Sequence, residues 1–315
     1  MLYVNSQIPA IESLARLGFS LSVGQEPTLP TVGLLNLMPQ KPETEFDFCK
    51  MLSTANLDVN LVLLKIPHQH YKTTPQAYVD AHYVDYAPSM AEASEDALVC
   101  GCGEKQVPSI DGLIVTGAPL EQMPFEDVRY WKELQNIWDW TAHCGIPTLN
   151  ICWAAQASLY YHFGVKKEQV DDKIFGVFEH DVLIENHTLT RGFTDTFLAP
   201  HSRHTKIEEE KLPTISELDI LAKSEDVGTL LVATKDLRKI FVTGHIEYDA
   251  DTLHNEYIRD KNSNLPIEVP VNYYPGNDDT KTPKNRWRGV AYLFYHNWLN
   301  QVYQQTPYDL TELSK

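Results

Sequence analysis

The sequence lacks any apolar run long enough to cross a membrane, and its first residues lack the features of a secretory signal. Even VNLVLLKI, at residues 59–66, is far shorter than the roughly 20 residues that a membrane span needs. The start, MLYVNSQIPAIESL, has neither a basic n-region nor an apolar h-region. We therefore expect a cytoplasmic protein that has no membrane partner.

Basic residues and cysteines are also scarce. The 26 Lys and Arg residues are outnumbered by 43 Asp and Glu, which gives a formal net charge of −17. This balance argues against nucleic acid as a partner, and it means that an anionic substrate must be met by local cations or helix N-termini. The cysteines are scattered and number five, an odd count that gives no sign of a disulfide framework and favours a reducing compartment.

Several ligand-binding motifs are missing. There is no G-x-G-x-x-G or Walker sequence, so a dinucleotide or P-loop site is not expected. Cys100 and Cys102, with His68 and His70, could suggest a metal site. A C-x-C pair without a second cysteine pair lacks the usual zinc-ligand spacing, however, so we interpret these thiols as incidental and expect no metal and no cofactor.

What the sequence does contain is an alternation of buried strands and helices. TVGLLNL at residues 31–37, a helix over residues 43–52 and a strand over residues 59–66 open the chain as β-α-β, which favours a parallel sheet. Further strands are expected at 111–116, 148–151 and 239–243, antiparallel strands within 176–232, and helices at 128–143, 153–161, 250–259 and 291–303. The predicted fold class is α/β, a single domain with a mostly parallel sheet flanked by helices.

The domain boundaries follow from the same patterns. Residues 1–30 resemble an irregular N-terminal extension with a short helical pattern near residues 11–17, and residues 31–305 form the domain. Residues 87–109 are expected to be an insertion loop, and residues 306–315 a C-terminal tail.

The stretch PTLNICWAAQASLYY, at residues 147–161, is the centre of the pattern. A short apolar strand ends at Cys152, and helix-favouring residues follow at once. A cysteine at a sharp strand-to-helix turn resembles a nucleophile elbow, because the helix N–H groups lower the thiol pKa and can receive an oxyanion. A buried structural cysteine is the alternative, and on this stretch alone the two readings are equally supported.

Three strands share one form, in which a hydrophobic run enters a small-residue turn at Gly117, Cys152 or Gly244. Such turns gather at the carboxyl edge of an open α/β sheet, where ligands bind. His245 and Glu247 follow the third strand two residues apart, so that extended backbone projects them to one side. Taken singly, His245 could be a surface or capping histidine. Together with Cys152 it favours a nucleophile–base–orienter set.

The order of several longer motifs resembles the homoserine O-succinyltransferase/O-acetyltransferase family. These motifs are LLNLMPQKPETE (34–45), DGLIVTGAPLE (111–121), ICWAAQA (151–157), FLAPHSR (197–203), FVTGHIEYDADTL (241–253) and NYYPGND (272–278). The resemblance implies a class I glutamine-amidotransferase-like fold with a flavodoxin-like core, and it suggests a homodimer. It also implies ping-pong acyl transfer from an acyl-CoA to the hydroxyl of an amino acid.

The resemblance assigns roles to individual residues. It implies that Cys152 carries the acyl group as a thioester, that His245 is the general base and that Glu247 orients it. The backbone N–H groups of Trp153 and Leu120 would form the oxyanion hole. The substrate-binding residues that the resemblance implies are Lys173, Ser202, Arg259 and, in the wider active-site region, Lys41.

Glu121 bears on the acyl donor. In the family that the sequence resembles, glycine at this position accompanies succinyl-CoA and glutamate accompanies acetyl-CoA. A carboxylate there fills volume and repels the free carboxylate of a succinyl group, which agrees with acetyl transfer. The family usually has proline between the catalytic histidine and glutamate, and here the residue is Ile246.

The expected function is an acetyl-CoA-dependent O-acetyltransferase of L-homoserine or L-serine. These two acceptors differ by one methylene, worth only about 1–3 kcal/mol in a pocket, so methionine and cysteine synthesis both stay open. The alternatives are a succinyl-CoA-dependent homoserine O-succinyltransferase, a Cys-His-Glu glutamine amidotransferase or amidohydrolase, and a non-catalytic binding protein on an enzyme scaffold.

Overall fold

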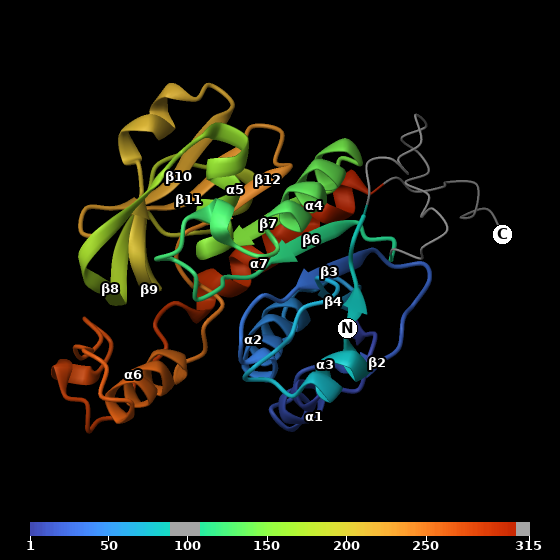
Figure 1. The fold of residues 1–315 in the computed structure, drawn as a ribbon, viewed down its shortest axis with the longest axis horizontal. Helices are drawn as coiled ribbons and strands as arrows, with labels where there is room; N and C mark the ends of the chain where they lie inside the picture. The colour runs from blue at the N-terminus through green and yellow to red at the C-terminus, as the bar shows by residue number, and fades with distance from the viewer. Residues whose placement is uncertain (89–107, 307–315) are drawn as a thin grey trace.

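The computed structural model describes residues 1–88 and 108–306, and these form one sheet of twelve strands (Figure 1). The strand order is β2-β1-β4-β3-β6-β7-β12-β11-β10-β8-β9, with β5 paired to β4. Every pairing from β2 across to β12 is parallel, and every pairing from β12 to β9 is antiparallel. The expected class, α/β with a mostly parallel sheet and an antiparallel continuation, is confirmed.

The bounds of the elements are as follows. The strands are β1 (Leu2–Val4), β2 (Leu21–Val23), β3 (Thr31–Leu35), β4 (Val59–Lys65), β5 (Val84–Asp85), β6 (Gly112–Val115), β7 (Thr148–Ile151), β8 (Lys167–Val182), β9 (Thr196–Ile207), β10 (Leu218–Ser224), β11 (Gly228–Thr234) and β12 (Lys239–Val242). The α-helices are α1 (Pro9–Arg16), α2 (Lys41–Ser53), α3 (Gln76–His82), α4 (Trp131–His143), α5 (Trp153–Phe163), α6 (Thr252–Asn262) and α7 (Arg288–Gln305).

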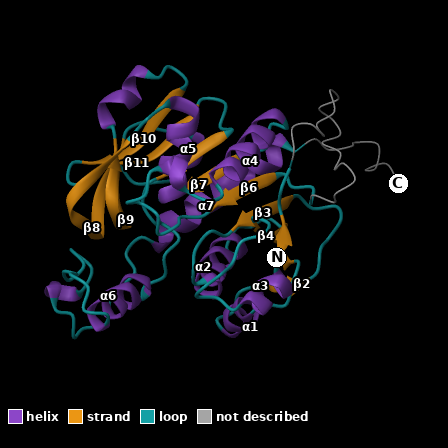
Figure 2. Cartoon of the chain, viewed as in Figure 1, coloured by secondary structure: helices purple, strands orange, loops and turns teal. Residues whose placement is uncertain are grey.

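Alternating side chains of the central strands build a core on each face of the sheet. Val32 and Leu34 of β3 pack in one hydrophobic cluster with α1, α2 and α7, whereas Leu35 packs in a second with α4 and α5. This is the period of two that a strand imposes, and all of these positions are apolar because both faces are covered. Figure 2 shows the helices flanking the strands in this way. The carboxyl edge of the parallel strands is thereby left for the loops that carry polar residues.

The antiparallel half of the sheet extends away from this core. β8 and β9 form a long hairpin, paired from Lys167 with Ile207 to Asp181 with Thr196, interrupted by a register shift between Gln169 and Ile174. In Figure 1, α6 lies beside one end of this hairpin. Residues of β8, β9 and α6 can therefore face one another across a shared space.

The N-terminal 30 residues differ from expectation, because they are not an irregular extension. Leu2 and Val4 of β1 are fully buried, and β1 pairs with β2 and β4 within the sheet. The two strands have only three residues each, too few to show a clear period, and tertiary pairing stabilises them instead. β8 also begins earlier than expected, at Lys167. Most of the predicted insertion, with Cys100 and Cys102, and residues 307–315 of the tail lie outside the described residues.

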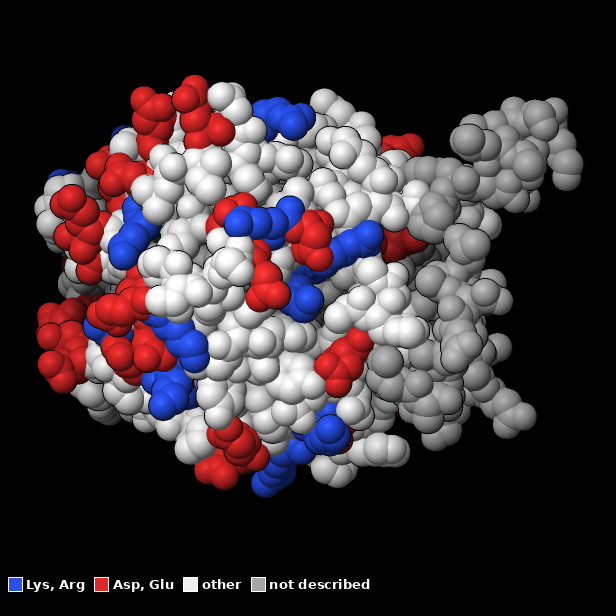
Figure 3. Space-filling model, turned by 90° about the horizontal axis from the view of Figure 1, so that it is seen from above, with Lys and Arg blue, Asp and Glu red and all other residues white. Residues whose placement is uncertain are grey.

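Charge is spread unevenly over the surface. On the face that Figure 3 shows, acidic side chains gather at the end away from the grey residues, and basic side chains lie among acidic ones. Within the described residues, no helix combines the length and the apolarity that crossing a membrane requires.

Candidate active site

Cys152 occupies a strained turn between β7 and α5. Its φ of 51° and ψ of −113° are unusual for a residue other than glycine, and its N–H donates to the carbonyl of Val242 on β12 at 2.7 Å. Strain of this kind at a strand-to-helix junction presents a nucleophile at the sheet edge. Trp153 is the first residue of α5, so its N–H belongs to the helix-opening groups that have no intrahelical acceptor. The predicted elbow is thus present in the structure.

His245 lies against Cys152 and is oriented by Glu247. The imidazole Nδ1 is 2.7 Å from Glu247 Oε1, and both side chains are buried. Cys152 and His245 both lie close to Gly117. A Cβ atom added to Gly117 would be 3.3 Å from Cys152 Cβ and 3.7 Å from His245 Cε1. Three turns distant in sequence, at Gly117, Cys152 and Gly244, therefore meet as the sequence predicted.

The electrostatics around His245 favour its charged form. Burial lowers the pKa of His245, but the thiolate of Cys152 and the carboxylate of Glu247 raise it by more, so the net shift is well above the usual value. His245 therefore lies between a sulfur and a carboxylate that both favour its protonated form. Tyr248 stacks on the imidazole, with ring centroids 4.1 Å apart, and limits its tilt.

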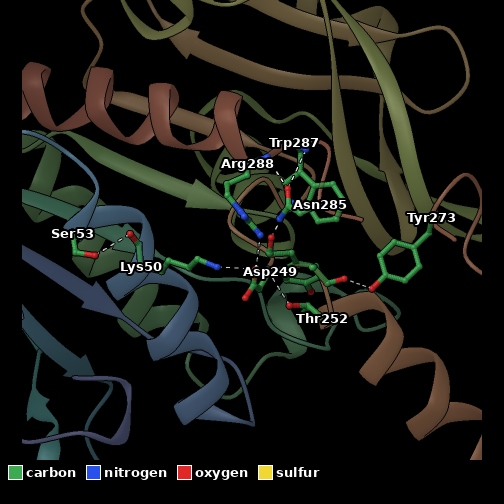
Figure 4. A network of polar contacts seen from close by, with 10 residues as sticks. Lys50, Ser53, Asp249, Thr252, Tyr273, Asn285, Trp287 and Arg288 are labelled. Atoms are coloured by element: carbon green, nitrogen blue, oxygen red, sulfur yellow. Dashed lines mark hydrogen bonds and ion pairs between the residues drawn. The ribbon is translucent and has the colours of Figure 1, made fainter. Parts of the chain in front are cut away.

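The segment that follows Glu247 is held by α2 and by the start of α7, as Figure 4 shows. Lys50 of α2 binds Asp249 with an Nζ–Oδ1 distance of 2.8 Å, and Arg288 of α7 lies 3.7 Å from the same oxygen. Trp287 Nε1 donates to the carbonyl of Tyr248 at 2.8 Å. A residue such as Glu247 can hold a fixed orientation because its neighbours in sequence are tied to the helices around it.

Gly244 is a position where only glycine fits, and we predict a large effect of Gly244→Ala. The added Cβ would lie 2.8 Å from the carbonyl oxygen of Pro200 and 2.9 Å from His201 Cε1, and that carbonyl accepts the N–H of His245. Overpacking against backbone typically costs about 1–3 kcal/mol. Thermal melting should show a lower midpoint, and turnover should fall because His245 shifts. Gly289→Ala in α7, where nothing lies within 4 Å, is the control and should leave both intact.

A cavity of about 230 Å³, which we call the catalytic cavity, opens over Cys152 and His245. It is lined by six of the residues that the sequence predicted for the site: Glu121, Cys152, Lys173, Ser202, His245 and Arg259. They come from the β6 turn, the β7–α5 elbow, β8, β9, the β12 turn and α6. The fold therefore collects residues from six separate segments around one thiol.

The α6 wall of this cavity contains acidic residues that the sequence analysis did not single out. Glu256 accepts from Ser202 Oγ at 2.5 Å and from Tyr248 OH at 2.8 Å, and Lys173 Nζ lies 3.7 Å away. Asp260 lies 3.6 Å from Lys173 and accepts from Arg259 Nε at 2.7 Å. Glu256, Arg259 and Asp260 have the i, i+3, i+4 spacing of one helix face, and that spacing was a signal available in the sequence.

Lys41 does not line the catalytic cavity. Its ammonium is buried, donates to the carbonyl of Asn36 at 2.6 Å and lies 4.5 Å from the centroid of the Tyr71 ring. Burial lowers the pKa of Lys41 to about 7. In this structure Lys41 therefore supports the turn that follows β3, rather than lying beside the thiol.

The backbone N–H of Leu120, unlike that of Trp153, already has a hydrogen-bond acceptor. Its N–H donates to the carbonyl of Ala118 at 2.8 Å, and its side chain lines a neighbouring cavity. To serve an oxyanion hole, this N–H would have to exchange that bond. Among the cysteines that the structure describes, Cys49 and Cys152 carry free thiols.

Solved structures with the same arrangement of elements are glutamine amidotransferases. A glutamine amidotransferase from Thermotoga maritima aligns with a TM-score of 0.56 at 13% identity, covering 87% of this chain and 98% of that one. One from Methylobacillus flagellatus aligns with a TM-score of 0.53 at 12% identity, covering 87% and 94%. At such low identity the likeness establishes the fold, and it confirms the expected class I glutamine-amidotransferase-like architecture.

A family model described as homoserine O-succinyltransferase matches residues 4–308. The chain belongs to that family. "Homoserine O-acetyltransferase" of Petrotoga mobilis is 46% identical over 283 residues, covering 90% of this chain and 86% of the relative. "Homoserine O-succinyltransferase" of Vibrio campbellii is 43% identical, covering 99% and 96%. Both names denote acyltransferases, and this family member is an acyltransferase enzyme; both acyl groups occur among its relatives.

Proposed function

We propose that this acyltransferase moves an acetyl group from acetyl-CoA to the side-chain hydroxyl of L-homoserine or L-serine through a thioester on Cys152. The observation that carries the proposal is the catalytic cavity itself. It is lined by Cys152, by His245, whose Nδ1 is bonded to Glu247, and by the carboxylate of Glu121, and the charged residues of α6 that also line it suit an amino acid. Its place would be an early acylation step in amino-acid biosynthesis.

The reaction proceeds in two halves. The Cys152 thiolate attacks the acyl carbonyl of the donor, the carbon–sulfur bond to CoA breaks, and His245 gives its proton to the departing CoA thiolate. In the second half, neutral His245 takes the proton of the acceptor hydroxyl, whose oxygen attacks the thioester. The ester product leaves, and the Cys152 thiolate and the imidazolium are restored. In this mechanism the N–H of Trp153, the first residue of α5, stabilises the oxyanion in both halves.

The acceptor amino acid would bind against α6. The bond from Arg259 to Asp260 uses Nε, so a bidentate pair between Nη1, Nη2 and the α-carboxylate stays possible. Glu256 and Asp260 supply carboxylates for the α-ammonium, in competition with Lys173. Ser202, fixed by Glu256, then lies on the path to Cys152 and can contact the acceptor side chain.

Glu121 supports acetyl over succinyl as the acyl group. Burial raises the pKa of its carboxyl, while the charges of His204, His245 and Lys173 oppose that shift. A succinyl group would bring a second carboxylate into this partly buried space, where like charges repel more strongly than in water. An acetyl group brings no charge and needs less volume.

The test is a set of reactions with purified protein. Acetyl-CoA or succinyl-CoA is combined with homoserine or serine, and the release of free CoA and the formation of the O-acyl product are followed. We expect turnover with acetyl-CoA and one of the two acceptors. Glutamine alone is included as a further substrate. Release of ammonia from glutamine, without any requirement for CoA, would replace the proposal with an amidohydrolase.

Glu121→Gly should shift the donor preference toward succinyl-CoA. The change removes both the volume and the charge that oppose the succinyl carboxylate, and a pocket contact of this kind is worth about 1–3 kcal/mol, or roughly 10- to 200-fold. The quantity to measure is the ratio of kcat/KM for the two donors with the acceptor held constant. Glu217→Gln, at an exposed position before β10, should leave that ratio unchanged. If the ratio were the same in Glu121→Gly as in the wild type, Glu121 would not determine the choice of acyl donor.

A further inference from the structure

A second cavity, of about 290 Å³, lies directly beside the catalytic cavity. The two share a wall made of Met38 and Pro39, after β3, and of Ala118 and Pro119, after β6. Both cavities, at about 230 and 290 Å³, are smaller than the roughly 300–1,000 Å³ of pockets that enclose a drug-sized ligand, so neither can enclose a large donor alone. A donor much larger than an amino acid must therefore extend beyond the catalytic cavity into adjoining space.

The lining of the second cavity differs in chemistry from that of the first. It contains the side chains of Leu37, Ile66, Tyr71, Leu120 and Tyr130, which are apolar or aromatic. The catalytic cavity instead carries charged groups along α6. The two spaces suit different ligands: the charged one an amino acid, the apolar one a long flexible chain.

The second cavity is bounded on one side by residues 67–75, the loop between β4 and α3. Thr74 Oγ1 donates to the carbonyl of Pro39 at 2.7 Å and accepts the N–H of Lys41 at 3.1 Å. The Tyr71 ring lies over the buried Lys41 ammonium. These contacts fix the loop against the Met38–Pro39 wall, so that the space is formed before a ligand enters, which lowers the cost of binding.

A cationic lysine and a histidine lie at the rim of this cavity. His70 and Lys72 line it and are exposed to solvent. The chain has a net charge of −17, so a polyanionic ligand gains nothing from the overall field and must be met by local cations. A largely apolar cavity that shares a wall with the cavity over Cys152, and that has a cation at its solvent-exposed rim, matches a ligand with an apolar arm and a phosphorylated head.

We propose that this second cavity is the donor cavity: it receives the pantetheine arm of acyl-CoA, the phosphates lie at His70 and Lys72, and the thioester reaches Cys152 past the shared wall. The inference rests on the proposed use of an acyl-CoA donor. It also places Leu120 and Glu121, consecutive residues, at the junction where the acyl group passes from one cavity to the other.

Two separate substitutions test the proposal: one fills the donor cavity, and the other reverses a charge at its rim. Thr73 lines the cavity and is exposed, so Thr73→Trp should fold normally and obstruct the arm. We expect Kd for CoA, measured by calorimetry, and KM for acetyl-CoA to rise about tenfold or more, while KM for the acceptor changes little. Lys72→Glu should weaken CoA binding and flatten its dependence on salt. Lys235→Glu, in the turn between β11 and β12, is the matched charge control and should change neither.

Different results would overturn the proposed function and the proposed donor cavity. Wild-type protein that binds CoA but transfers no acyl group would overturn the proposed function, and the binding series would still decide where CoA lies. Thr73→Trp that melts like wild type and binds CoA with wild-type affinity would overturn the donor cavity, whatever the enzyme transfers. A rise in the acceptor KM equal to that of acetyl-CoA would also overturn it, because the cavity would then serve both substrates.

Discussion

Cys152→Ala should abolish turnover and with it the acyl-enzyme. Nothing else described in the catalytic cavity can carry an acyl group as a thioester, since Cys49, the other free thiol of the described residues, is buried in α2. Loss of a covalent nucleophile typically costs roughly 10⁴-fold or more in kcat. With acetyl-CoA and no acceptor, intact-mass measurement should show one added acetyl group on the wild-type protein and none on the variant.

Cys49→Ala is the matched control, because it removes a thiol of the same kind that lies outside the cavity. It should retain the acyl adduct and most of the activity. The adduct on wild-type protein should disappear on addition of the acceptor, at a rate no slower than turnover. If Cys152→Ala still produced the O-acyl amino acid from acetyl-CoA, a direct transfer between the two substrates would replace the two-step mechanism.

Glu247→Gln should lower kcat by about 10²- to 10⁴-fold and move the alkaline limb of the pH profile to lower pH. Burial depresses the pKa of His245, and the anions Cys152 and Glu247 together raise it beyond its usual value. Removing one anion leaves burial less opposed, so the pKa of His245 falls. The imidazolium that must protonate departing CoA is then lost at a lower pH than in the wild type.

The measurement is kcat/KM for acetyl-CoA as a function of pH, which reports the ionisations of the free enzyme. Glu217→Gln, an exposed carboxylate outside the site, should leave both the height and the position of the profile unchanged. Glu247→Gln that lost activity but kept the wild-type alkaline limb would assign Glu247 a structural role only. A shift toward higher pH would contradict the electrostatic account of the triad.

The elements and the triad were largely predictable from local sequence. β3, β4, β6, β7 and β12 are continuous apolar runs, which is what burial on both faces of a parallel sheet demands. Small-residue turns after three of them marked the sheet edge, and the spacing of His245 and Glu247 followed from the alternation of extended backbone. These are local rules, so a single sequence contains them.

Other features depend on contacts between distant segments. The three-residue strands β1 and β2 have no period of their own, and pairing beside β4 stabilises them. Lys41 was expected in the wider active-site region. Burying a charge is unfavourable unless it is paired, and the Lys41 ammonium instead contacts the carbonyl of Asn36 and the rings of Tyr71 and Tyr83.

The sequence by itself therefore determined the α/β class and the family, and it singled out Cys152, His245 and Glu247, which the structure brings together. Hydrophobic period, turn residues and motif order are properties of neighbouring residues, and they need no knowledge of packing. Only the tertiary structure decided that Glu256 and Asp260 face Ser202 and Lys173 across the catalytic cavity, and that residues 67–75 close a second cavity beside it. Both arrangements join segments far apart in the chain, and it is the packing of α6 and of the loop against the sheet edge that brings them together.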